Sequence, residues 1–533
     1  MAQAVRSTDL PSDAIQVATR RVLPGWIVTG GAVLVVGAAA AAPVLARIND
    51  SFWADELWSL GIARSPLHVL WSTYLWGPES NMALYYVLLR GWLAATSWIG
   101  LPASEWVVRL PSLAFSVLAA LAVLALGWRL HANRVVGVVA GLLFALNPLV
   151  LDAAGDNARA YSLALLLVTL SWLALFAIMD EGHLSRSAAW RWRALYVAAT
   201  ALAVYAHEIA VLVFFGQAIM VAALVVSGLR RRQPLPGWLP GWIGSVGASA
   251  VLAAPLALDV KGHGANNVWV WPVGPSDVIH LLGHMTGQQP AFLLALLGAG
   301  GVAFVVGVLP QQWTGLKPAE KREPSAPSWS VPALGLLCWG LTPVVITYVL
   351  TQPSLNLHLF NPRYLVLVVP AVCLLAGLGV AELRPRSLMA GGAVGLVALA
   401  LIATIGAPAI SAPREDLRGA AAWVTAKASP GDGVIPLTWG AAMALDEYAP
   451  ALTTPGTPGR MDWSTGGASP VEESQLASFV AGRHRVFLVE DADNAEVASA
   501  RAWFEGHNYR LIAQHEASGA YGPVVVLEYQ AGP

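Results

Sequence analysis

Two adjacent carboxylates, Asp55 and Glu56, follow the first long apolar run of this 533-residue sequence. Carboxylates next to a membrane are costly to desolvate unless they are paired, bind a metal ion or take part in proton transfer. The pair therefore has the chemistry of a general base or of a metal ligand. Alternatively, both residues lie in the first turn of a solvated helix, where negative charge is favourable.

A second polar group, Asp156, Arg159 and Tyr161, lies in a short segment between two later apolar runs. If both runs cross a membrane, these side chains emerge where one helix leaves it and the next enters. They can then face the same cavity as Asp55. An aspartate and an arginine three residues apart also suit a local salt bridge, which is the simpler interpretation.

Three further sites carry polar residues between apolar runs: His207 in a third turn, Lys261 in a predicted loop, and Arg363 with Tyr364 at the start of a later run. Histidine ligates metals or contacts phosphate, and arginine binds phosphate through two parallel hydrogen bonds. The alternatives are a buried structural histidine and basic anchors at the membrane interface. Glu208 follows His207, but adjacent helical residues diverge by about 100°, so these two alone do not make a metal site.

The composition indicates the class of protein, and therefore the kind of elements, that must position these residues. Hydrophobic residues make up 56% of the chain and charged residues 12%, against roughly 25% charged in soluble proteins. The chain is therefore a membrane protein. Its formal net charge of -1 gives no overall basic field for nucleic acid. Cys338 and Cys373 both lie in apolar runs, so neither a disulfide framework nor a thiolate metal site is expected.

A membrane helix needs about 20 apolar residues, and eleven runs of the sequence meet this requirement. They begin near Trp26, Val108, Val135, Ala160, Ala194, Ile209, Leu239, Pro290, Val331, Tyr364 and Leu388. The first run lacks a small-residue cleavage site and is expected to remain a membrane helix. With the N-terminus in the cytoplasm, 16 of the 31 lysines and arginines fall on the inner side and 7 on the outer side before residue 412. The positive-inside rule then places the C-terminal region outside the cell.

Two segments are not expected to cross the membrane. Met82 to Ile99 is broken by arginine and tryptophan and is predicted to lie along the outer interface, within a first outer loop of about residues 48–106. Residues 413–533 hold 15 of the 32 acidic residues and no apolar run of spanning length. They are predicted to form an extracytoplasmic α/β domain beside a membrane domain of residues 1–412. Its strands are expected at 433–438, 485–490, 509–515 and 523–529, and its helices at 416–427 and 494–507.

The order of motifs resembles that of the GT-C glycosyltransferases. The resemblance covers about residues 20–410 and is carried by Asp55-Glu56-x-Trp58-Ser59, Leu84-Tyr85-Tyr86, Arg109-Leu110-Pro111-Ser112, Asp156-x-x-Arg159-Ala160-Tyr161-Ser162-Leu163 and Arg363-Tyr364. The bacterial branch with protein O-mannosyltransferases, the lipid A aminoarabinose transferase and predicted membrane-bound mannosyltransferases is the most similar. Two departures stand out. Asn81-Met82-Ala83 precedes the tyrosine pair where that branch often has His-Pro, and Gly155-Asp156-Asn157 replaces the usual Gln-Glu before Ala-Arg.

The resemblance implies a polytopic α-helical GT-C fold and transfer of a sugar, mannose or a pentose, from a polyprenyl-phosphate donor to a hydroxyl acceptor. The reaction would occur at the outer face of the cytoplasmic membrane with inversion, and the acceptor would be a glycan, lipid or protein. By motif position, Asp55 would be the general base, Glu56 would support it and Asp156 would be the second acid. The residues expected to bind the donor phosphate or substrate are Arg159, Tyr161, His207, Lys261, Arg363, Tyr364 and Tyr85.

A divalent ion such as Mg²⁺, Mn²⁺ or Ca²⁺ is a further possibility, with Glu56, Asp156 and His207 as candidate ligands. Two other functions remain open from the residues. A transporter or lipid flippase would place ionisable groups near the bilayer midplane and often shows inverted repeats, whereas most charges here lie at helix ends and no repeat is visible. A membrane-anchored binding protein would leave eleven crossings without a role.

Overall fold

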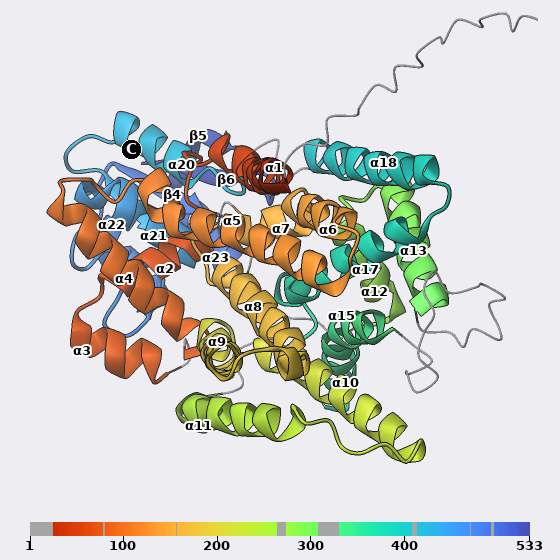
Figure 1. Cartoon of the computed structure of the whole chain (residues 1–533). Coiled ribbons are helices and arrows are strands. Elements are labelled where there is room, and N and C mark those ends of the chain that lie inside the picture. Colours follow the sequence, from red (N-terminus) through yellow and green to blue (C-terminus); the bar gives the residue numbers. More distant parts are fainter. Residues whose placement is uncertain are drawn as a thin grey trace, which may run out of the picture.

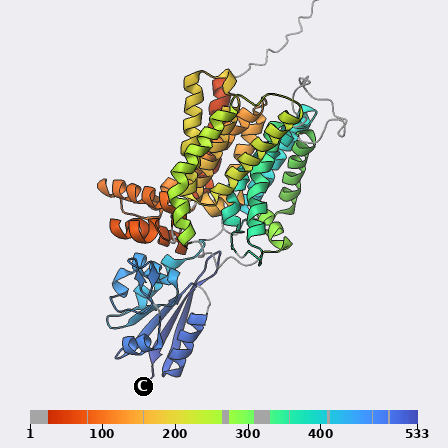
Figure 2. The same cartoon turned by 90° about the horizontal axis from the view of Figure 1, so that it is seen from below.

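The protein is an α-helical bundle with a small α/β domain at one end (Figure 1). The computed structural model describes residues 25–77, 80–155, 157–263, 273–307, 330–355, 357–407, 413–469, 471–491 and 495–532. In Figure 2 the blue C-terminal domain lies below the bundle, and the orange-red helices that follow α1 project sideways between the two.

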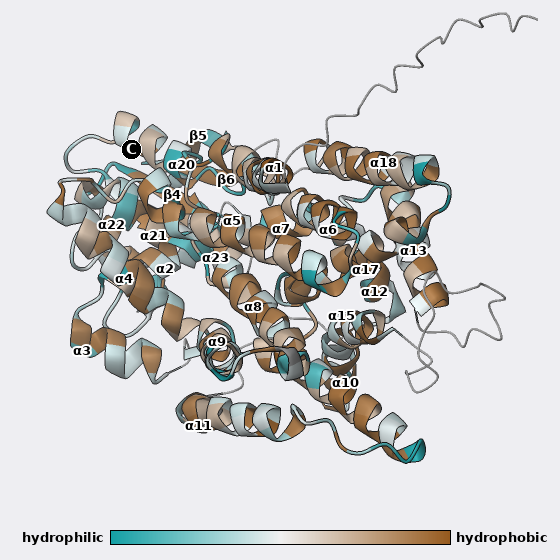
Figure 3. Cartoon of the chain, viewed as in Figure 1, coloured by the Kyte–Doolittle hydropathy of each residue, from teal (hydrophilic) through white to brown (hydrophobic). Residues whose placement is uncertain are grey.

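Among the described residues, nine helices are long and apolar enough to cross a membrane. These are α1 (Gly25–Leu45), α5 (Glu105–Leu130), α8 (Tyr161–Met179), α10 (Ala210–Arg230), α11 (Leu239–His263), α13 (Pro290–Gly307), α15 (Val331–Leu350), the continuous span of α16 (Pro362–Leu365), η5 (Val366–Val368) and α17 (Val369–Glu382), and α18 (Arg386–Ile405). Figure 3 shows α10 and α18 as largely hydrophobic, each with a hydrophilic end. Their apolar outer surfaces suit contact with lipid.

Two of the eleven predicted runs are not among these nine helices. The run from Val135 forms α6 (Val135–Ala145), followed after a 50° bend by α7 (Pro148–Val150) and η3 (Leu151–Gly155), which together make a tenth candidate span. Asn147 ends the first segment and caps the second by accepting hydrogen bonds from the amides of residues 149 and 150. The run from Ala194 lies in α9 (Arg186–Ala206), whose first half carries arginines and therefore lacks the hydropathy of a full span.

Small residues allow the helices of the bundle to approach closely. A Cβ on Gly127 of α5 would lie 2.5 Å from the Cα of Gly137 of α6, and one on Gly379 of α17 would lie 1.8 Å from a carbonyl oxygen of α13. Glycine at such contacts is the usual way for membrane helices to pack. Trp172 of α8 stacks on Trp339 of α15 with ring centroids 5.2 Å apart, which packs these two helices together.

The predicted first outer segment, between α1 and α5, contains short helices that do not run with the bundle. They are α2 (Ala54–Arg64), α3 (Leu67–Val69), η1 (Leu70–Leu75), η2 (Ser80–Met82) and α4 (Ala83–Trp98). The segment predicted at Met82 to Ile99 is helical and forms α4, and Figure 2 shows these helices lying across the direction of the bundle. Remaining short helices outside the spans are η4 (Glu181–His183) and α12 (Pro275–Met285).

The C-terminal domain has a four-stranded sheet in the order β1-β4-β6-β5. Its strands are β1 (Gly433–Pro436), β4 (Arg485–Glu490), β5 (Tyr509–Ala517) and β6 (Val524–Ala531), with a small hairpin of β2 (Met461–Asp462) and β3 (Gly467–Ala468). Strands β1 and β4 are parallel, and the other pairs are antiparallel. The helices are α20 (Leu417–Lys427), α21 (Trp439–Tyr448), η6 (Pro450–Leu452), α22 (Glu473–Val480) and α23 (Ala495–Gly506). All four predicted strands and both predicted helices are confirmed.

Candidate active site

At the N-terminus of α2, one of the two predicted carboxylates is partly exposed and the other is buried. Helix α2 begins at Ala54, so Asp55 and Glu56 both lie in its first turn, where the helix dipole favours negative charge. Successive helical residues point about 100° apart. The Asp55 side chain is therefore partly exposed, at 27%, while Glu56 is fully buried.

The Glu56 carboxylate is bound by residues of the membrane domain. The guanidinium of Arg109 in α5 donates to both of its oxygens, from Nε at 2.8 Å and from Nη2 at 2.6 Å. The backbone amide of Ala158 donates a third hydrogen bond at 2.9 Å. A carboxylate satisfied in this way fixes the start of α2 against α5 and the segment before α8, and its oxygens are already occupied. The geometry therefore favours a positioning function for Glu56 over metal binding.

Asp55 faces two guanidinium groups. Its Oδ2 lies 3.6 Å from Nη1 of Arg363 and 3.9 Å from Nη2 of Arg159. These residues come from α16 and from the segment before α8, so three distant parts of the sequence converge here. Two positive charges against one negative charge leave a local excess that suits an anionic ligand.

Aromatic rings form one wall beside these arginines. The His207 ring lies 5.2 Å from the ring of Tyr161 and 5.3 Å from that of Tyr364, and all three residues are buried. The backbone amide of Ile209 donates to Nδ1 of His207, so a neutral imidazole carries its proton on Nε2. Within the described part of the chain, Nε2 has no hydrogen-bond partner. It is available to donate to a ligand.

Tyr85 supports the site from behind. The Tyr85 hydroxyl lies 2.8 Å from Oγ of Ser112 in α5. The same Oγ of Ser112 lies 3.5 Å from the carbonyl oxygen of Arg159. The side chain of Tyr85 is 1% exposed. This chain of contacts connects Tyr85 to the backbone of Arg159, and the contact of Tyr85 with a substrate stays a prediction.

Comparison with known proteins identifies the architecture. No family model matches the sequence, and no curated protein matches it. ArnT from Cupriavidus metallidurans in the apo state is similar in structure, with a TM-score of 0.52 at 14% identity over 94% of this chain and 98% of that one. The archaeal oligosaccharyltransferase AglB from Archaeoglobus fulgidus, in complex with an inhibitory peptide and a dolichol-phosphate, gives 0.52 at 11% identity over 94% of this chain and 74% of that one. Both are GT-C superfamily glycosyltransferases.

The chain has the GT-C fold. This confirms the fold expected from the order of the motifs, including the helices of the first outer segment and the α/β domain after the bundle.

Two predicted site residues have side chains outside the described residues. Asp156 lies outside the described residues. Lys261 lies in the last turn of α11 instead of the expected loop, and its side chain is likewise outside the described part. Among the described residues, no group of three histidine, cysteine, aspartate or glutamate side chains is arranged to hold a metal ion. The Glu56 carboxylate is paired with Arg109, so the three candidate ligands are not seen to converge in the described part of the chain.

Several residues of the candidate site were missed by sequence reasoning. Trp53 lies beneath both Arg363 and Arg414, whose guanidinium carbons are 4.6 Å and 5.2 Å from its ring centroid. Asp152 of η3 accepts a 2.5 Å hydrogen bond from the hydroxyl of Tyr521 and lies 3.5 Å from Nε of Arg414. Burial raises the pKa of Tyr521, which keeps that hydroxyl protonated as a donor. Arg414 and Tyr521 belong to the C-terminal domain, and no local pattern connects them with the membrane segments.

Proposed function

We propose that this protein is a glycosyltransferase that moves a sugar from a polyprenyl-phosphate donor to a hydroxyl acceptor, with Asp55 as the general base. The observation that carries the proposal is a carboxylate faced by the guanidinium groups of Arg363 and Arg159 at the junction of an apolar bundle and a polar domain. The GT-C fold supports it, because the similar AglB structure holds a dolichol-phosphate.

The residues around Asp55 match the parts of such a donor. A phosphate would lie against Arg159 and Arg363, which can form charge-assisted hydrogen bonds to its oxygens. The Nε2 proton of His207 would add a neutral donor. Tyr161 and Tyr364 offer aromatic surface for the sugar or the first isoprene unit, and the prenyl chain would lie along the apolar helices.

The chemistry follows from these positions. Oδ1 of Asp55 would accept the proton of the acceptor hydroxyl while Arg363 and Arg159 orient Oδ2. The acceptor oxygen would form a bond to the anomeric carbon as the bond from that carbon to the phosphate oxygen breaks. The electron pair of the broken bond would remain on the phosphate, where the two guanidinium groups stabilise the additional charge. One displacement of this kind inverts the anomeric centre.

The finer assignments belong to the same proposal. The sugar would be mannose or a pentose, and the acceptor a glycan, lipid or protein hydroxyl at the outer face of the cytoplasmic membrane. A divalent ion remains a candidate partner through Asp156, although Glu56 is already paired with Arg109.

Replacement of the general base tests the proposal directly. Asp55→Asn keeps the size and polarity of the side chain but removes its basicity, so transfer should fall about 10²-fold to 10⁴-fold. The measurement is transfer of radiolabelled sugar from a polyprenyl-phosphate donor by purified protein, together with its melting temperature. Asp180→Asn is a matched control, because Asp180 pairs with Arg129 on an exposed surface away from this site. Full activity of Asp55→Asn in a folded protein would reject the assignment.

A further inference from the structure

The segment that leads into α2 is held from two sides. On the side of the membrane domain, the guanidinium of Arg109 donates to the carbonyl oxygens of Ile48, Asp50 and Ser51 at 3.1, 2.7 and 3.0 Å. The same guanidinium binds Glu56. One buried arginine thus fixes both the segment and the first turn of the helix that carries the proposed base.

On the other side, the C-terminal domain binds the same segment. Oε2 of Glu415 accepts a 2.9 Å hydrogen bond from the backbone amide of Ala54. The backbone amide of Arg418 donates to Oγ of Ser51 at 3.0 Å, and the amide of Phe52 donates to a tyrosine hydroxyl of α21 at 2.9 Å. Glu415 makes the contact that lies next to Asp55.

Glu56 accepts from the amide of Trp53 at the start of α2, and Glu415 accepts from the next amide, that of Ala54. The first amides of a helix have no intrahelical partner, and the residue before α2, Trp53, makes no capping hydrogen bond with its side chain. A carboxylate from another domain therefore caps the helix at Ala54. Negative charge is also favourable at this end of a helix.

We propose that Glu415 is a positioning residue for sugar transfer, because its carboxylate holds the first turn of α2 and so fixes Asp55 opposite Arg159 and Arg363. The C-terminal domain is then part of the active site through an acid that lies about 360 residues away in the sequence. This inference rests on the proposed function, and the experiments below separate the two.

The surroundings of Glu415 give the contact a pH dependence. Burial is the main cause that raises the pKa of Glu415 to about 7, and the charges of Asp491 after β4 and of Asp55 on α2 raise it further. The amide of Ala54 and the guanidinium of Arg363 on α16 act in the opposite direction. Glu415 is therefore mostly protonated below pH 7 and ionised above it. The ionised form accepts the stronger hydrogen bond, since charge-assisted bonds are roughly twice as strong as neutral ones.

Three variants separate positioning from a merely structural effect. Glu415→Ala removes the cap, and kcat should fall about tenfold to a hundredfold with little change in the donor KM, because small misplacements of a reacting group have large effects on rate. Glu415→Gln retains an acceptor for the amide and should keep kcat within about threefold of the low-pH rate of the wild type. Glu447→Gln is the matched control, since Glu447 lies on the same domain surface but pairs with Arg64; it should leave transfer unchanged.

The pH profile provides a second measurement. For the wild type, kcat should rise as the pH increases through 7, because Glu415 ionises and tightens its bond to Ala54. Glu415→Gln cannot ionise and should lose that rise, while titration of other groups remains in both profiles. The inference would be overturned if the wild type is active and Glu415→Ala has the same kcat and the same pH profile. The proposed function would then remain intact.

Hydrogen exchange tests the contact without any assay of transfer. In the full-length protein, Glu415→Ala should speed amide exchange in the peptide spanning residues 52–57, whereas Glu447→Gln should not. Unchanged exchange in Glu415→Ala would contradict the capping contact itself. If the wild type transfers no sugar from any polyprenyl-phosphate donor, the proposed function fails, and increased exchange would still confirm that Glu415 holds α2.

Discussion

At the scale of single residues, two neighbouring carboxylates have different functions because of one helical step. Asp55 points to the arginines of the site, whereas Glu56 points into the bundle and pairs with Arg109. The buried pair is enclosed on all sides, with 3% and 0% of the two side chains exposed. Such a pair is costly to separate, because either charge left alone has no solvent to stabilise it.

Removal of Arg109 should therefore destabilise the protein. Arg109→Met leaves Glu56 buried without a counter-charge, and the expected loss is about 3–5 kcal/mol of unfolding free energy. The measurement is thermal melting in detergent. Arg129→Met is the control, because the exposed pair of Arg129 with Asp180 should contribute only about 0–1 kcal/mol. Equal melting temperatures for the two variants would contradict the structural function of the Glu56 pair.

Residues that lie at the ends of apolar runs could be predicted from the sequence. By the predicted topology, each of these residues begins or ends a run on the same side of the membrane, and the structure brings them together: Arg159, Tyr161, His207, Arg363 and Tyr364. Their positions follow from topology, because the ends of membrane helices on one side must share one plane.

The remaining site residues could not be predicted in this way. Trp53, Arg414, Glu415 and Tyr521 meet only when the C-terminal domain docks on the first outer segment. No periodicity or spacing encodes a contact between segments so far apart. Tyr85 was predicted from its motif, but its hydrogen bond to α5 was not, because that bond depends on how two helices pack.

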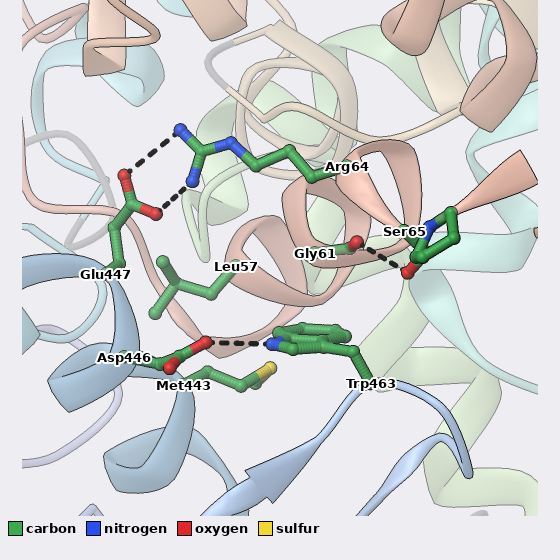
Figure 4. Close-up of a pocket in the computed structure, with 9 residues that line it drawn as sticks. Leu57, Gly61, Arg64, Ser65, Met443, Asp446, Glu447 and Trp463 are labelled. Atoms are coloured by element: carbon green, nitrogen blue, oxygen red, sulfur yellow. Dashed lines mark hydrogen bonds and ion pairs between the residues drawn. The ribbon is translucent and has the colours of Figure 1, made fainter. Parts of the chain in front are cut away.

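At the scale of elements, the docking of α21 on α2 joins the two domains. Figure 4 shows the contact, where a pocket of about 260 Å³ is lined from α2 by Gly61 and Arg64 and from the C-terminal domain by Asp446, Glu447 and Trp463. The indole of Trp463 donates a 2.8 Å hydrogen bond to Asp446. A Cβ at Gly61 would lie 1.8 Å from this indole, so only glycine permits the approach.

A methyl group at this contact should loosen the domain interface. Gly61→Ala must displace Trp463, which is held by its bond to Asp446, and overpacking of this kind typically costs about 1–3 kcal/mol. Faster hydrogen exchange in β2 and β3 would report the displacement. Gly91→Ala is the matched control, because nothing lies within 4 Å of a Cβ there and alanine favours a helix by about 0.5–1 kcal/mol. Equal exchange in the two variants would show that Trp463 can move without loosening the domain interface.

The sequence predicts elements well where their hydrophobic pattern is long. Each of the eleven apolar runs lies in a helix, and the four strands of the sheet alternate or are continuously apolar. Helices α21 and α22 were missed because both are short, and α21 directly follows a strand. Thr438, which caps α21 through its hydroxyl, was the available signal.

At the scale of the whole molecule, the arrangement of the two domains and the uneven distribution of basic residues together predict how the protein is oriented in the membrane. The C-terminal domain lies at one end of the bundle (Figure 2), beside the outer turns that hold Asp55 and Arg363. Of the 31 lysines and arginines, 16 lie on the opposite side by the predicted topology. The positive-inside rule places that side in the cytoplasm, so the candidate active site would face outward, where the proposed lipid-linked donor would bind.

Cysteine labelling tests this orientation. In a background with Cys338→Ala and Cys373→Ala, Ser518→Cys places a thiol on an exposed turn of the C-terminal domain and Ser187→Cys places one in the exposed first turn of α9. A membrane-impermeant maleimide should label the first variant in intact cells and the second only after permeabilisation. Both substitutions are at exposed serines, so equal labelling in permeabilised cells controls for reactivity. The reverse pattern would place Asp55 in the cytoplasm, and an outward-facing transfer reaction would then be excluded.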